Sequence, residues 1–169
     1  MFSTVLALGD TDISLAHGIA TNAAGAGTGA DADSPARAII VFADLRDLSR
    51  HDIKERLRSF SALALAETRR RPRIRHVVFA VMLPLRRASM FDRVASALGT
   101  RLHADLERER GRDVEVTFLD VSHCNDAPLL TERLLARSSD PTGRNGVVVL
   151  DWDDIRDHTI AHAARIEYL

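Results

Sequence analysis

The chain has 169 residues, 46% of them hydrophobic and 28% charged, which is enough material for one globular domain with a sizeable core. Its 23 Lys and Arg residues nearly balance 24 Asp and Glu residues, so its charge gives no general attraction to nucleic acid or an anionic membrane. The single cysteine, Cys124, excludes an internal disulfide, and no apolar run approaches the roughly 18 residues of a membrane span. We therefore expect an intracellular protein, cytoplasmic or nuclear, with no membrane partner.

Apolar runs rich in Val, Ile, Phe and Leu alternate with longer amphipathic segments along the whole chain. The apolar runs predict strands over residues 2–8, 37–44, 75–83, 113–120 and 146–151. Continuous runs of this kind are typical of strands that are buried on both faces. The expected fold class is α/β, a three-layer α/β/α sandwich with a mostly parallel or mixed central sheet, formed by residues 1–169 as a single domain.

Helix start and stop signals separate these strands. Ser49 and Asp52 resemble a capping box, and Pro72 predicts that the helix they begin ends near Arg70. Ser89 and Asp92 repeat the signature, and Gly111 supplies the stop of that second helix. Two further helices are expected over residues 128–137 and 152–166.

The stretch "GDTDISLAHGIATNAAGAGTG", residues 9–29, leaves the first strand and passes through a possible short strand, "HGIAT". Its glycines would let backbone N–H groups approach a phosphate closely. The same composition also suits a flexible connection. The pattern matches neither the dinucleotide-binding GxGxxG motif nor the P-loop, so neither of those sites is predicted.

This stretch resembles the opening of a macro domain, in which a GD-containing strand end leads to an NAAN-like motif and a glycine-rich loop. The similarity continues through residues 2–120, and residues 121–169 would be a C-terminal addition of a strand and a helix. The resemblance implies binding of ADP-ribose or a related nucleotide, with no further cofactor. It places Asp10 at the adenine, Asn22 at the ligand-side end of a strand, and Gly27 and Gly29 near the phosphates.

The chain departs from the macro pattern at two positions that bear on activity. Gly25 stands where the family has the asparagine that orients the distal ribose, so little or no hydrolase activity is expected. After the third strand the chain has "LPLRRASM" in place of a second glycine loop. Arg86 in that segment could bind phosphate through its guanidinium group, or lie on a solvated surface.

A second group of polar residues follows the last predicted strand in "VVVLDWDDIRDHTIAH". Asp154, His158 and His162 recur in steps of four, which would place a carboxylate and two imidazoles on one face of a helix as possible metal ligands. Alternatively, the acidic residues only complement the helix N-terminus and the histidines lie on the surface.

Two smaller features have functional and ordinary interpretations. The basic turn "RRRPRIR", residues 69–75, could contact nucleic acid, but no aromatic residues are interleaved for base stacking, which argues against a nucleic-acid partner. The segment "SHCND", residues 122–126, could hold a Cys–His nucleophile or be a plain loop.

Three functions from different classes remain open on the sequence alone. The first is a divergent macro-like domain that binds ADP-ribose or a related nucleotide. The second is a structural or protein-interaction module that has lost its ligand site. The third is a metal-dependent α/β enzyme that uses the C-terminal Asp/His cluster.

Overall fold

Parallel strands form the centre of the molecule. They are β1 (Val5–Gly9), β2 (Ala38–Asp44), β3 (His76–Met82), β4 (Glu115–Asp120) and β5 (Val147–Asp151). All four neighbouring pairs are parallel, in the spatial order β1-β2-β3-β4-β5. The computed structural model describes residues 5–12, 14–19, 36–84, 88–111, 113–142 and 146–167. The predicted α/β class is confirmed, and each strand lies within its predicted range or ends one residue beyond it.

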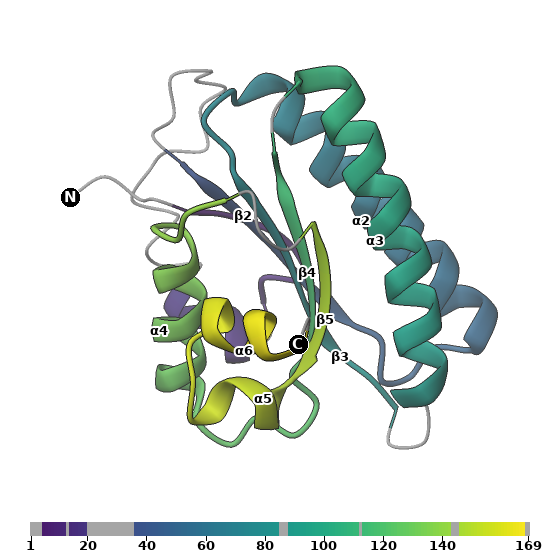
Figure 1. Cartoon of the computed structure of the whole chain (residues 1–169). Coiled ribbons are helices and arrows are strands. Elements are labelled where there is room, and N and C mark those ends of the chain that lie inside the picture. Colours follow the sequence, from purple (N-terminus) through teal and green to yellow (C-terminus); the bar gives the residue numbers. More distant parts are fainter. Residues whose placement is uncertain are drawn as a thin grey trace.

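Helices cover both faces of the sheet, which gives the predicted three layers (Figure 1). One face carries α2 (Arg50–Arg70) and α3 (Ala88–Arg110). The other carries the short 3-10 helix η1 (Ser14–Ala16), α4 (Ala127–Arg137), α5 (Trp152–Arg156) and α6 (Ile160–Glu167). Side chains alternate along β2, so Ile39 and Val41 enter the first core while Ile40 and Phe42 enter the second.

Local sequence signals explain where the two long helices begin and end. The Ser49 hydroxyl accepts a hydrogen bond from the Asp52 N–H at 3.3 Å, which caps α2 as predicted. Helix α3 begins at Ala88, one residue earlier than the predicted cap at Ser89. Gly111 follows α3 with a φ of +57°, a left-handed conformation that favours glycine after a helix.

Aromatic contacts fix α3 against the sheet. Phe79 of β3 and Phe118 of β4 are register partners whose rings stack with centroids 4.4 Å apart. Phe91 of α3 meets the Phe118 ring edge-on at 6.2 Å. Such ring pairs add to the burial of apolar area and favour one relative placement of helix and sheet.

Two local predictions are wrong. A single helix over residues 152–166 was expected, but α5 ends at Arg156 and α6 begins at Ile160. The Thr159 hydroxyl accepts from the His162 N–H at 3.2 Å, and Arg133 donates to the Ile155 carbonyl at 3.2 Å, so side chains satisfy both new helix ends. Residues 17–19 of the expected short strand are helical.

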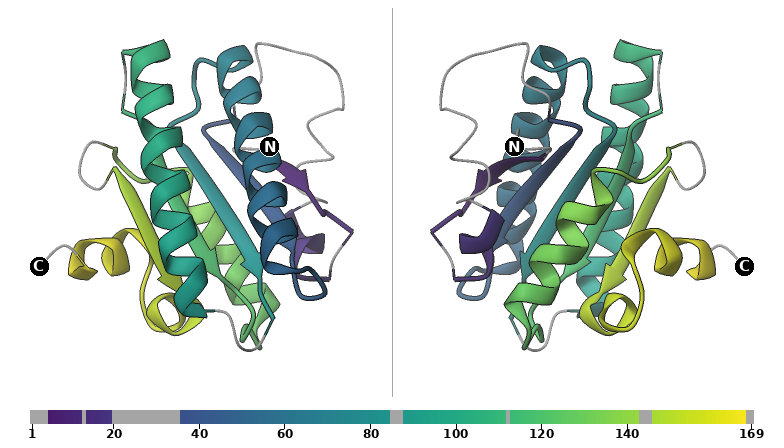
Figure 2. Two further views of the ribbon diagram at one scale, coloured as in Figure 1. Left: turned by 90° about the vertical axis from the view of Figure 1, so that its right-hand side faces the viewer. Right: turned by 90° about the vertical axis from the view of Figure 1, so that its left-hand side faces the viewer.

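The connections between strands do not all run over the same face of the sheet. The β2–β3 and β3–β4 connections pass through α2 and α3, whereas the β4–β5 connection passes through α4 on the opposite face (Figure 2). Since the strands follow one another in one direction, the two groups of connections have opposite hands. The α4 crossover is left-handed, as in only about 2% of such connections.

No helix among the described residues combines the length and the apolar composition that a membrane span requires.

Candidate ligand site at the carboxyl end of the sheet

A crevice opens where β1 and β2 end. The chain leaves β1 toward η1 on one face of the sheet and leaves β2 toward α2 on the other. In open α/β sheets, adjacent strands whose connections diverge in this way leave a crevice outside their carboxyl ends, where ligands bind. The corresponding cavity has a volume of about 720 Å³ and is bordered by Asp10, Asp44, Leu48, Arg56 and Ser59, together with further acidic side chains.

Gly9 places Asp10 at the edge of this crevice. Its φ is +81°, and a Cβ atom there would lie 2.2 Å from the Phe42 carbonyl oxygen, so only glycine fits. That close approach lets the Asp10 N–H donate to the same carbonyl at 2.9 Å. The predicted adenine-contacting residue therefore lies directly beside the end of β2.

The Asp10 carboxylate is held by one group on each of its oxygens. Its Oδ2 accepts from the Asp44 N–H at 2.9 Å, and its Oδ1 accepts from Arg56 at 2.6 Å. Arg56 also lies over the Phe60 ring, 4.6 Å from the centroid, which fixes the guanidinium from the other side. The carboxylate is thus oriented before any ligand arrives.

Carboxylates dominate the wall of the β1/β2 crevice. Asp12, Asp47, Asp52 and Glu55 border the cavity in addition to Asp10 and Asp44. A hydrogen bond from the Arg46 guanidinium lowers the pKa of the Asp44 carboxyl, which therefore stays ionised at neutral pH. This wall suits hydrogen-bond donors and cations, and it repels a phosphate group.

A second acidic groove lies between α3 and the edge strand β5. It has a volume of about 630 Å³, and Asp92, Asp120, Asp151 and Asp154 border it. Asp120 and Asp151 end register-paired strands, so parallel pairing brings them together. Burial, followed by the charges of Asp120 and Asp151, raises the pKa of Asp92.

The segment after β4 uses its serine to join two strand ends, and its geometry gives no support to the Cys–His nucleophile that was one interpretation of "SHCND". The Ser122 hydroxyl donates to Asp120 and accepts from the Leu83 N–H at 2.7 Å, so it joins the ends of β3 and β4. Burial raises the pKa of the Cys124 thiol. A raised pKa disfavours the thiolate, which is the nucleophilic form of cysteine.

The C-terminal Asp/His cluster is distributed over two helices and the segment between them. Asp151 and Asp154 form a reciprocal capping box at the start of α5, which commits both carboxylates to backbone N–H groups. His158 lies between α5 and α6, and its ring is 4.6 Å from that of His162. Within the part of the chain that the structure describes, the potential ligand atoms of Asp154, His158 and His162 do not all lie within 4.8 Å of one another.

The basic turn at residues 69–75 is partly neutralised by neighbouring carboxylates. Arg69 donates to Glu109 of α3, and Arg70 and Arg71 both pair with Glu67. Arg69 and Arg70 stay exposed and Arg71 is largely buried, but all three face a neighbouring carboxylate, so the turn offers phosphate groups less net positive charge than the sequence indicates.

Most of the predicted ligand residues lie outside the described part of the chain. These are Asn22, Gly25, Gly27, Gly29 and Arg86. Of the residues predicted to bind ligand, the structure places Asp10 alone, and it adds Asp44 and Arg56, which sequence reasoning missed. Asp44 had a usable signal, because it is the last residue of a buried strand whose neighbours in a parallel sheet end at the same edge. Arg56 had none, since its contact with Asp10 joins α2 to β1 across 46 positions.

No protein-family model, no curated protein and no solved structure matches this chain.

Proposed function

We propose that this chain binds ADP-ribose or a related nucleotide in the crevice between β1 and β2, with little or no hydrolase activity. The position of Asp10 supports the proposal, because it lies at the carboxyl end of a parallel strand, beside a point where the connections diverge. The cavity of about 720 Å³ is within the usual size range of small-molecule sites.

The carboxylate of Asp10 is the observation that carries this proposal. An ionised carboxylate offers about four lone-pair positions, and the Asp44 N–H and Arg56 use one on each oxygen. Its side chain is 20% exposed, so an outer lone pair remains accessible from the crevice. That acceptor suits the exocyclic amino group of an adenine, which would meet a group already held in place.

The diphosphate of such a ligand must lie away from the acidic wall. The wall would repel the diphosphate more strongly the closer it lies to the carboxylates of Asp47, Asp52 and Glu55. The glycine-rich stretch, with Gly25, Gly27 and Gly29, and the guanidinium of Arg86 are the groups that we propose for the phosphates.

Isothermal titration calorimetry with ADP-ribose tests this function. We expect saturable micromolar binding by the unmodified chain and at least about tenfold weaker binding by Asp10→Ala, which loses the adenine acceptor. Asp47→Ala is the matched control, since it removes an acidic group from the same crevice without removing the proposed contact. We expect it to bind as well as the unmodified chain or better.

Two results would overturn the proposal. The first is no heat and no thermal stabilisation at millimolar ADP-ribose, which would favour an interaction module without a ligand site. The second is equal loss of affinity in both variants, because Asp10 would then have no special role. Circular dichroism of each variant distinguishes lost binding from lost folding.

A further inference from the structure

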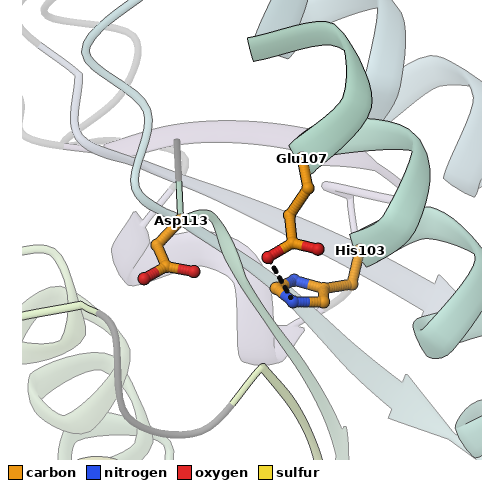
Figure 3. A group of neighbouring side chains, drawn as sticks. All are labelled: His103, Glu107 and Asp113. Atoms are coloured by element: carbon orange, nitrogen blue, oxygen red, sulfur yellow. Dashed lines mark ion pairs between the residues drawn. The ribbon is translucent and has the colours of Figure 1, made fainter. Parts of the chain in front are cut away.

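A histidine and two carboxylates converge at the amino-terminal end of the sheet, just beyond Thr100, the last α3 residue that borders the second acidic groove. His103 and Glu107 are four residues apart on α3 and therefore lie on the same face of that helix. The Gly111 N–H donates to the Glu107 carbonyl at 2.8 Å as the helix ends, and Asp113 follows before β4 begins. Potential ligand atoms of His103, Glu107 and Asp113 all lie within 4.8 Å of one another (Figure 3).

The backbone fixes which nitrogen of His103 faces the carboxylates. Nδ1 lies 2.8 Å from the Val114 carbonyl oxygen, which can only accept, so Nδ1 carries the proton of this hydrogen bond. Nε2 then points toward Glu107, 3.4 Å from its Oε1. A ligating histidine typically donates its other ring N–H to a carbonyl or carboxylate, which is the arrangement seen here.

Packing holds the imidazole while leaving the carboxylates accessible. The His103 side chain is 18% exposed, whereas that of Glu107 is 51% exposed. Gly146, which precedes β5, lies so close that a Cβ atom there would be 3.3 Å from Nε2. The ring is thus confined between α3, β4 and the start of β5, with one side of the group open to water.

We propose that His103, Glu107 and Asp113 bind one divalent transition-metal ion of the Zn²⁺ type. Imidazole nitrogen and carboxylate oxygen are both ligands of Zn²⁺, three protein ligands with a water are enough for an open site, and the two negative charges balance the ion. Water completes the coordination on the exposed side. Mg²⁺ and Ca²⁺ fit less well, because both prefer a shell made only of oxygen atoms.

Bound metal would connect the end of α3 to the start of β4. Glu107 and Asp113 lie on opposite sides of the turn at Gly111, so one ion holding both restrains that turn. An ion that binds only the folded chain raises its stability according to its concentration relative to Kd. This role is independent of nucleotide binding at the other end of the sheet.

Calorimetric titration of the chelator-treated full chain with ZnCl₂ tests the site. We expect one Zn²⁺ per chain, a higher melting temperature when Zn²⁺ is present, and no comparable response to MgCl₂. His103→Asn and Glu107→Gln should each weaken Zn²⁺ binding by at least about tenfold. The exposed Glu107→Gln change leaves the hydrogen bond between His103 and Val114 in place, so it tests the site even if His103→Asn folds poorly.

The matched control is His162→Asn, which removes an exposed histidine whose ring faces His158. We expect it to bind Zn²⁺ as the unmodified chain does. Absence of saturable Zn²⁺ binding would overturn the proposal. Retention of the one-to-one complex in both His103→Asn and Glu107→Gln, with its loss in His162→Asn, would also overturn it and assign the metal to the C-terminal histidines.

Discussion

The two ends of the central sheet use charged residues in opposite ways. At the carboxyl end, Asp10, Asp120 and Asp151 follow or end strands beside open grooves. At the amino-terminal end, Glu115 begins β4 and is buried, and the Nη2 atom of Arg137 donates to its Oε2 at 2.6 Å. Charged residues therefore border open grooves at the carboxyl end, whereas the group around Glu115 and Arg137 at the other end is sealed from water.

The sealed network extends beyond a single ion pair. Arg137 also reaches Asp140 at 3.1 Å, and His76 Nε2 lies 3.0 Å from the Asp140 carbonyl oxygen. Arg137 and Glu115 expose 1% and 3% of their side chains. Burying charges so completely requires that each retain its partner, whereas the exposed acids at the carboxyl end are stabilised by water. Removing a charge should thus have a large effect within this buried network and a small one in the grooves at the carboxyl end.

The largest expected effect is that of Arg137→Met. Glu115 would remain buried without its guanidinium partner, and we expect a loss of about 3–5 kcal/mol in the free energy of unfolding, measured with urea. The double variant Arg137→Met with Glu115→Leu should be more stable than the single one, since no carboxylate is left behind. A loss below about 1 kcal/mol in the single variant would contradict the sealed character of this end.

Alanine substitutions of two glycines, one at each end of the sheet, test how tightly the backbone is constrained in the two regions. Gly9→Ala places a Cβ atom 2.2 Å from the Phe42 carbonyl oxygen at a φ of +81°, so strain and a steric clash combine. Gly111→Ala meets nothing within 4 Å and adds only the strain of a φ of +57°. We expect losses of at least about 2 kcal/mol for the first and about 1 kcal/mol for the second by urea denaturation. Equal losses would show that the end of β1 shifts easily.

Acidification should affect the amino-terminal end through His76. Burial, and next the charge of Arg137, lowers the pKa of His76, so the folded chain keeps this ring neutral. Between the folded pKa and the unfolded value near 6.5, the unfolded chain binds one more proton at this position, and stability falls as pH falls. Above that window the ring is neutral in both states and adds no pH dependence.

Urea denaturation at pH 7.5 and at pH 5.5 measures this effect. A single such group contributes at most about 1.4 kcal/mol per pH unit inside the window. The decrease in the free energy of unfolding from pH 7.5 to pH 5.5 should be smaller in His76→Gln, because glutamine cannot take up the proton. An identical decrease in the variant and the unmodified chain would assign the pH dependence to other groups.

The sequence predicts the strands and long helices well because their signals are local. Buried runs such as that ending in Asp44 define strands, and the Ser49 hydroxyl caps α2 as its position indicates. The break before Ile160 was missed because it depends on Thr159 and on Arg133, which reaches across from α4. Helical periodicity alone continues through that break.

The arrangement of the sheet and of the sites depends on contacts between distant segments. Nothing local in residues 121–146 indicates a left-handed connection through α4. Asp10 was predicted from its motif, but its partner Arg56 comes from α2. His103 and Glu107 share visible helical spacing, whereas Asp113 joins them only through the turn at Gly111.

The smallest expected effect is a gain in stability from Asp92→Asn. Burial, and next the charges of Asp120 and Asp151, raises the pKa of Asp92, and Asp92 lies past the first turn of α3, where it gains little from the helix dipole. The groove is open to solvent, so relief of this repulsion should add only a few tenths of a kcal/mol at pH 7.

Asp105→Asn is the control for this gain, because Asp105 pairs with Arg108 on the same helix and its loss should bring no increase. Both variants are compared by urea denaturation at low and at high salt. The gain in Asp92→Asn should shrink at high salt, where the repulsion is already screened. A decrease in stability would instead show that Asp92 makes a favourable contact. The carboxylates of this groove would then depend on partners as the buried network around Glu115 does, and the contrast between the two regions would not hold for it.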